Sequence, residues 1–139
     1  MRITLESDYA LRIISALALH NEIVDAKTLA NETSVTLNFT LKILRKLVNS
    51  DFVKSYKGIN GGYQLKLPAE KITLKEVIER IDGPIAIVRC LEFSETCSLN
   101  QDKTACIYHH IFDTISHDVS RKLENITIAD VLNKTYKIV

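Results

Sequence analysis

All three cysteines of this 139-residue chain, Cys90, Cys97 and Cys106, lie in one segment, and His109 and His110 follow it directly. Thiolates are soft ligands that select iron–sulfur clusters, zinc or copper(I). In a reducing compartment, clustered cysteines bind metals or carry redox chemistry more often than they form disulfides. An odd number of cysteines also leaves one thiol outside any set of disulfides. The segment is therefore a candidate metal or redox site.

The gaps between the cysteines narrow the kind of site. Six residues separate Cys90 from Cys97, and eight separate Cys97 from Cys106. Structural zinc sites usually pair cysteines across about two to four residues, so this spacing argues against zinc. Iron–sulfur clusters usually take four thiolates, so a cluster here needs a fourth ligand from elsewhere. His109 lies one helical turn beyond Cys106 and could face the same site, with His110 as a weaker candidate.

The rest of the chain predicts a mainly helical fold with one small β-hairpin. Helices are expected over residues 8–20, 25–31, 37–49, 73–83, 106–124 and 127–134, and strands over 52–56 and 62–67. The expected N-caps are Asp25, Thr36 or Asn38, Thr73 and Thr127. Glu76 completes a capping box with Thr73. Three of the four glycines lie in or beside the joint between the strands, as a tight hairpin requires.

The helix over 37–49 is amphipathic and basic. Its apolar residues Leu37, Leu41, Leu44 and Val48 recur at helical spacing and are expected to face the core. Residues 36–66 hold six basic residues and one acidic residue. The chain has a net charge of +1, so the rest of it carries −4 against this +5. A basic segment in an otherwise acidic chain is expected of a protein that binds a polyanion, although a solvated charged surface has the same composition.

The order helix, short helix, turn, helix, hairpin is that of a winged helix-turn-helix, whose third helix enters the DNA major groove. Asn38 and Thr40 lie at the end of this helix where base edges are reached, whereas its lysines and arginine are expected to meet phosphates. The predicted DNA contacts are Thr36, Asn38, Phe39, Thr40, Lys42, Arg45, Lys46, Lys54, Ser55, Lys57, Asn60, Gly61, Gly62 and Tyr63. The wing glycines would let backbone N–H groups approach phosphate closely. The alternative is an ordinary hairpin beside an amphipathic helix.

Three segments are expected: a winged helix-turn-helix domain over 1–84, a cysteine-rich loop over 85–105, and a dimerisation helix with a C-terminal helix over 106–139. The long helix repeats a branched apolar residue at Ile107, Ile111, Ile115, Val119 and Leu123, which suits helix–helix packing. No apolar run approaches the roughly 18 residues of a membrane span, and no signal peptide opens the chain. A cytoplasmic protein without a membrane partner is expected. The absence of a catalytic constellation or P-loop argues against an enzyme.

Four stretches carry a resemblance over nearly the whole chain. MRITLESDYALRI, FVKSYKGINGGYQL, TLKEVIERIDGP and ENITIADVLN, with the cysteine-rich loop, resemble the IscR/NsrR/CymR-type family of bacterial winged-helix transcription regulators. The resemblance implies a homodimer joined through the long C-terminal helix, with a double-stranded DNA operator as partner. At the position similar to Leu41, the IscR branch carries a glutamate. Leucine cannot accept a hydrogen bond from the cytosine amino group, so that branch's operator sequence is not implied.

The same resemblance implies that the three cysteines hold an iron–sulfur cluster. The C-x2-H pattern of Cys106 and His109 is similar to the IscR branch and implies a 2Fe-2S cluster. Asp8 looks like the aspartate that reaches across the dimer in NsrR-type regulators, which implies a 4Fe-4S cluster. Glu6 is a weaker candidate. The eight-residue gap before Cys106 is longer than is usual in the family.

Three modes of control are compatible with these residues. A cluster would make the protein a sensor of iron or cluster supply, nitric oxide or redox state. Without metal, the cysteines would form a thiol switch through sulfenic acid or a disulfide. In CymR-type members, control comes through contact with a partner enzyme, and this predicts DNA binding that depends on a partner protein.

Overall fold

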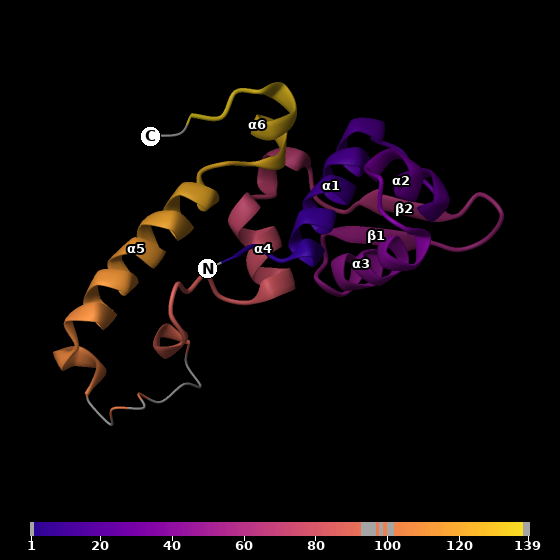
Figure 1. Ribbon diagram of the computed structural model, residues 1–139. Helices are drawn as coiled ribbons and strands as arrows, with labels where there is room; N and C mark the ends of the chain where they lie inside the picture. The colour runs from indigo at the N-terminus through magenta and orange to yellow at the C-terminus, as the bar shows by residue number, and fades with distance from the viewer. Residues whose placement is uncertain (1, 93–96, 98, 100–101, 138–139) are drawn as a thin grey trace.

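The computed structural model describes residues 2–92, 97, 99 and 102–137. The α-helices are α1 (Leu5–His20), α2 (Ala26–Thr33), α3 (Leu37–Asn49), α4 (Leu74–Asp82), α5 (Ile107–Glu124) and α6 (Ile128–Asn133). The strands β1 (Val53–Tyr56) and β2 (Gly62–Leu65) form an antiparallel pair. Short 3-10 turns are η1 (Ala69–Lys71), η2 (Arg89–Leu91) and η3 (Lys103–Ala105). The predicted fold class, mainly α with a small β-hairpin, is confirmed (Figure 1).

Capping side chains fix where the helices begin. Asp25, Thr36, Thr73 and Thr127 each accept a hydrogen bond from the backbone N–H three residues on, as the sequence predicts. Helix α1 begins at Leu5, three residues before the predicted start, because Thr4 caps it through the N–H of Ser7 at 3.3 Å. After Leu5, its first turn consists of the polar residues Glu6, Ser7 and Asp8, so apolar periodicity does not mark it.

The core joins residues from the whole length of the chain. Leu17 of α1, Leu44 of α3, Val77 of α4 and Ile128 of α6 are fully or almost fully buried in one cluster. The N–H of Ile128 donates to the carbonyl oxygen of Ile72 at 2.9 Å. Helix α6, which the sequence grouped with the dimerisation helix, therefore completes the core of the winged part. The segment boundaries themselves stay a prediction.

The buried face of α3 differs from the predicted one. Thr40, Ile43, Leu44 and Leu47 are fully buried, whereas Leu37 is 45% and Leu41 38% exposed. The inward stripe follows spacings of three, four and seven residues from Thr40. The predicted buried face of α3 consisted mainly of leucines and left out Thr40, which is buried in the core although it is polar. The expectation for Leu44 is correct, and those for Leu37 and Leu41 are wrong.

Helix α5 runs away from the winged part and packs mainly against α4 (Figure 1). The hydroxyl of buried Ser116 accepts a hydrogen bond from the N–H of Ile87 at 3.1 Å, so residues before η2 are fastened to the middle of α5. Ile107, Ile111 and Ile115 are exposed by 66%, 46% and 42%. These three isoleucines of the apolar stripe are therefore not covered by the described chain, whereas Val119 and Leu123 are half-buried. None of the helices in the described residues combines the length and the apolar character needed to cross a membrane.

Candidate nucleic-acid interface and thiol segment

The wing is a four-residue ladder with a tightly closed tip. The N–H of Gly61 donates to the carbonyl oxygen of Gly58 at 3.0 Å. Gly58 has a φ of +101°, in the left-handed region that glycine tolerates best. Ile59 is fully exposed at the tip. The loop projects from the end of the molecule opposite α5 (Figure 1).

Strand β2, the second strand of the wing, is hydrogen-bonded to the turn before α2. The N–H of Tyr63 donates to the carbonyl oxygen of Val24 at 2.8 Å, and the N–H of Val24 donates back at 2.9 Å. At Gly62 the two backbones approach so closely that a Cβ would lie 2.5 Å from the Val24 carbonyl oxygen. Gly62 thus serves the packing of the wing against α2.

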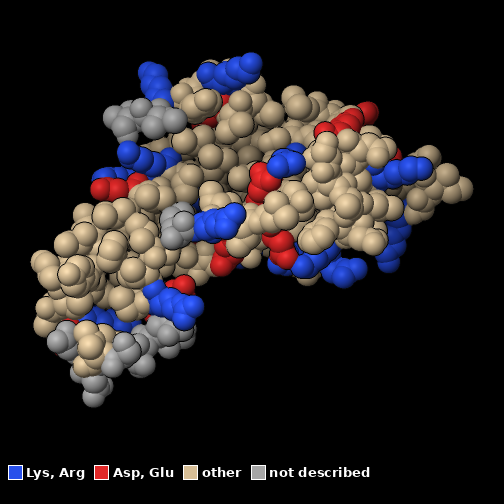
Figure 2. Space-filling view, viewed as in Figure 1, with Lys and Arg blue, Asp and Glu red and all other residues tan. Residues whose placement is uncertain are grey.

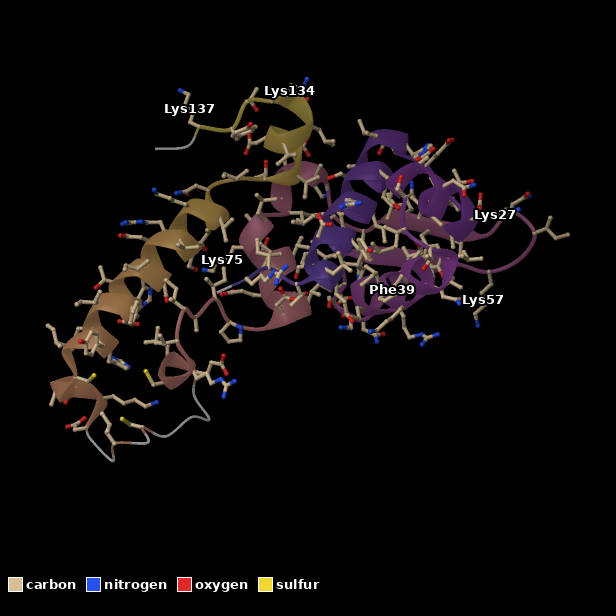
Figure 3. The ribbon with its side chains drawn as sticks, in the orientation of Figure 1. Lys27, Phe39, Lys57, Lys75, Lys134 and Lys137 are labelled. Atoms are coloured by element: carbon tan, nitrogen blue, oxygen red, sulfur yellow. The ribbon has the colours of Figure 1, made fainter. Side chains whose placement is uncertain are left out.

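Basic side chains of α3 and the wing are exposed and gather over α3 (Figure 2). Figure 3 places Phe39 of α3 and Lys57 of the wing along this part of the molecule. The predicted contacts that lie on exposed positions are Thr36, Asn38, Phe39, Lys42, Arg45, Lys54, Ser55, Lys57 and Asn60, and Lys46 is half-buried. Within the described part of the chain, Arg45, Lys54 and Lys57 form no ion pair. These cations are available to a polyanion.

Aromatic side chains pack between the N-terminal end of α3 and α1. The rings of Tyr9 and Phe39 meet edge to face, with centroids 5.8 Å apart. The ammonium of Lys42 lies 5.8 Å from the Phe39 centroid, and the guanidinium of Arg12 lies 5.5 Å from the Tyr9 centroid. Such edge-to-face and cation–π contacts fix side-chain orientation. Phe39 is 41% exposed, so one part of its ring remains open to a ligand.

Glu6 of α1 lies beneath the basic face and binds two of its lysines. One carboxylate oxygen accepts a hydrogen bond from Lys42 and the other accepts one from Lys46. The bond from Lys42, followed by that from Lys46, lowers the pKa of Glu6 below its ordinary value. Glu6 is therefore ionised at neutral pH, and the three side chains together carry one positive charge.

Three predicted DNA contacts have polar groups that are buried or already hydrogen-bonded within the chain. The Thr40 side chain is fully buried, so its hydroxyl faces the core rather than base edges. The N–H of Gly61 is bonded inside the wing, and that of Tyr63 is bonded to Val24. The prediction that Thr40 reaches a base is wrong, because the inward stripe of α3 is rotated relative to the expected one. The prediction that the N–H groups of the wing glycines meet phosphate is wrong for Gly61.

The thiol segment lies at the start of α5, away from α3. Cys90, Cys97 and Cys106 are free and half-buried. Cys106 is the N-cap residue of α5, and Figure 3 draws sulfur atoms, in yellow, at the end of the molecule where α5 begins. Residues 93–96, 98, 100 and 101 of the predicted cysteine-rich loop lie outside the described residues. Among the residues described, no group of three or more histidine, cysteine, aspartate or glutamate side chains is gathered as a metal ion would need.

The candidate fourth ligands differ in what they already contact. The Nδ1 atom of His109 is buried and has no hydrogen-bond partner in the described chain. The ring of His110 already has a hydrogen-bond partner, because its Nε2 lies 2.6 Å from the carbonyl oxygen of Thr104. Asp8, on α1, pairs with Arg12 at 2.5 Å and is 45% exposed. The unpartnered ring nitrogen of His109, three residues after Cys106, suits a ligand role better than a nitrogen that already has a hydrogen-bond partner.

Sequence reasoning missed two features of the interface. It treated Glu6 as a weak metal candidate, although Lys42 and Lys46 are spaced as neighbours on one helix face, and a nearby acid can bridge such a pair. It also gave no role to Val24, whose backbone holds β2. A contact between residues so distant in the chain has no local sequence signal.

Comparisons with known proteins agree on one family. The chain matches Rrf2, described as "Iron-dependent Transcriptional regulator", over residues 3–134. It is 28% identical to a putative HTH-type transcriptional regulator of Haemophilus influenzae, covering 96% of this chain and 88% of that one. It is also 28% identical to the HTH-type transcriptional regulator IscR of Yersinia pseudotuberculosis, covering 96% and 80%.

A solved structure shares the fold. CymR (YrzC), the global cysteine regulator of B. subtilis, superposes with a TM-score of 0.78 at 23% identity, covering 96% of this chain and 98% of that one. At this identity the likeness supports the winged-helix fold. The matched relatives are transcriptional regulators and not enzymes. The chain therefore belongs to the Rrf2 family of transcriptional regulators.

Proposed function

We propose that the protein is a homodimeric transcription regulator that binds operator DNA through α3 and the wing. The observation that carries this proposal is the exposed basic face that α3 and the wing share. Asn38 lies near the N-terminal end of α3, which is the part of a recognition helix that contacts base edges. Arg45, Lys54 and Lys57 are free cations within the described chain, and phosphate contacts of this kind supply most non-specific affinity.

The phosphate role of the wing can be tested at Lys57. Lys57→Ala should weaken binding to all duplex sequences to a similar extent, because phosphate contacts carry no base information. The slope of log affinity against log salt should become shallower by about 0.9, as expected for one lost phosphate contact. Fluorescence anisotropy over a salt series measures both quantities. Lys71→Ala, on exposed η1, is the matched control. Equal slopes for the wild type and Lys57→Ala would refute the assignment.

In the proposed homodimer, the two chains contact each other through α5. Its exposed isoleucines at positions 107, 111 and 115 form a stripe of the kind that packs against a second helix. A second copy of the chain is the partner that the family relationship favours. Two winged parts in one dimer would contact two operator half-sites, as two-fold symmetric regulators do.

The proposed regulatory site, which would control DNA binding, is an iron–sulfur cluster bound by Cys90, Cys97 and Cys106. The donor types fit such a group: three free thiols, with the unpartnered Nδ1 of His109 as a fourth donor. Asp8 of a second copy is the alternative fourth ligand. When bound, a cluster supplies a centre that responds to iron supply, nitric oxide or oxidants. Cys106 is the N-cap residue of α5, so a ligand bound to its thiol acts directly on the start of the proposed dimer helix.

Cluster binding is tested by anaerobic purification. The protein should contain iron and sulfide and absorb in the visible range, or acquire these on reconstitution. His109→Ala should change the spectrum if His109 is a ligand, and Asp8→Ala should change it if Asp8 is. His110→Ala is the matched control, because that ring is engaged by Thr104. A colourless protein that gains neither iron nor sulfide on reconstitution would rule out the cluster.

A cluster-free thiol switch is the second candidate. It is favoured by the three free thiols and by the absence of a gathered metal-binding group among the described residues. In this case oxidant should change operator affinity in metal-free protein, with a loss of titratable thiols. Oxidant-insensitive binding by the metal-free protein would exclude it.

A further inference from the structure

Glu6 is an acidic side chain inside the proposed DNA-binding face. It lies on α1, yet both of its carboxylate oxygens bind lysines of α3. The side chain of Glu6 is only 25% exposed, whereas those of Lys42 and Lys46 are 51% and 40% exposed. The carboxylate therefore lies behind the two ammonium groups, which stay within reach of solvent.

This arrangement halves the charge that two lysines would offer to DNA. An ammonium group has three N–H donors, so Lys42 and Lys46 can each bind Glu6 and still present a donor to a phosphate. The attraction of a phosphate for the pair is nevertheless reduced by the negative charge beside it. Exposed ion pairs of this kind contribute little to folding stability, so stability alone does not account for an acid at this position.

We propose that Glu6 restrains the affinity of α3 for DNA of any sequence. Non-specific binding is almost entirely electrostatic, whereas operator binding adds base contacts that Glu6 does not touch. The negative charge of Glu6 thus removes one unit of positive charge from the phosphate-facing set and weakens binding to every duplex by a similar factor. The inference rests on the proposed function, because it requires that α3 faces DNA.

The test compares the wild type with Glu6→Gln, which keeps the shape of the side chain and removes its charge. DNA binding is measured by fluorescence anisotropy over a salt series, with a random-sequence duplex and with a duplex selected by the wild-type protein from a random library. Glu6→Gln should bind the random duplex roughly threefold to tenfold more tightly at low salt, with a slope steeper by about 0.9. The ratio of selected to random affinity should stay about the same, because phosphate contacts carry no base information.

Two further variants separate charge from shape. Glu6→Asp keeps the charge and should retain the wild-type salt slope. Glu124→Gln is the matched control, because it also releases a lysine from a carboxylate, Lys75 at 3.3 Å, but on the side of α4 and α5. It should leave binding to both duplexes unchanged. Thermal unfolding of each variant checks that the fold is kept.

A second measurement does not depend on any Glu6 variant. In the wild type, Lys42 is partly neutralised and Lys57 forms no ion pair within the described chain. Lys42→Ala should therefore change the salt slope by clearly less than the value of about 0.9 expected for a free phosphate contact. Equal slope changes for Lys42→Ala and Lys57→Ala would overturn the inference, as would an unchanged slope in Glu6→Gln while the wild type binds DNA. A wild-type protein that binds no DNA would instead overturn the proposed function.

Discussion

Gly62→Ala should lower the free energy of unfolding by about 2–4 kcal/mol and remove most DNA binding. An alanine Cβ at this position would lie 2.5 Å from the carbonyl oxygen and 2.7 Å from the carbonyl carbon of Val24. Both atoms belong to backbone, and they are held in place by the paired hydrogen bonds between Val24 and Tyr63. Relief of the clash requires that β2 move away from the turn before α2, and the wing moves with it.

Gly58→Ala is the control for this experiment. Gly58 also has a positive φ, +101°, but a Cβ there meets nothing within 4 Å. Its cost is limited to backbone strain, about 1 kcal/mol. Chemical denaturation of the two variants isolates the effect of the close approach at Gly62. Similar unfolding free energies for both would show that the contact with Val24 does not constrain the wing.

The double variant Ile111→Asp, Ile115→Asp should convert the proposed dimer to a monomer and weaken operator binding by at least about 100-fold. Each isoleucine buried at an interface contributes roughly 1.5–3 kcal/mol, and an aspartate in its place would bury an unpaired charge. Loss of the dimer then removes the gain from binding two half-sites at once, which typically amounts to factors of about 10²–10⁴. Sedimentation analysis gives the oligomeric state, and anisotropy gives the affinity for a selected duplex.

The monomer fold should survive this change, because both side chains are already more than 40% exposed in the single chain. Leu19→Asp, at a position of α1 that is 71% exposed, introduces the same kind of charge outside α5 and should leave the dimer intact. A double variant that sediments as the wild type does would move the dimer contact away from this stripe.

Local sequence patterns predicted the helices and strands well, but they predicted contacts between residues distant in the chain poorly. Asp25, Thr73 and Thr127 mark helix starts because an N-cap needs only a side chain and a backbone N–H three residues away. The inward face of α3 was predicted from three leucines and a valine, and this failed at Leu37 and Leu41. A fully buried Thr40 shows that the core selects by position on the helix rather than by residue type.

The same contrast between local features and long-range contacts applies to the candidate site. Exposed basic residues such as Arg45 and Lys57 could be predicted, because charge composition is visible in the sequence. The contact of Glu6 with Lys42 joins residues 36 positions apart, and only the packing of α1 on α3 brings them together. The cysteines were found by residue type, while the identity of a fourth ligand depends on how two segments, or two chains, meet.

The position of α6 has a mechanical consequence for the dimer proposed here. Helix α5 has 18 residues, about 27 Å in length at 1.5 Å per residue, and α6 locks its C-terminal end into the core. Its other end, at Cys106, carries the thiol segment. Ser116 also holds the middle of α5, so the part from Ile107 to Ile115, about 14 Å long at 1.5 Å per residue, acts as a lever: a tilt of about ten degrees displaces the end at Cys106 by roughly 2 Å. Neighbouring half-sites on DNA are separated by roughly 34 Å, and a shift of that size in each of two copies would change the distance between the two recognition helices.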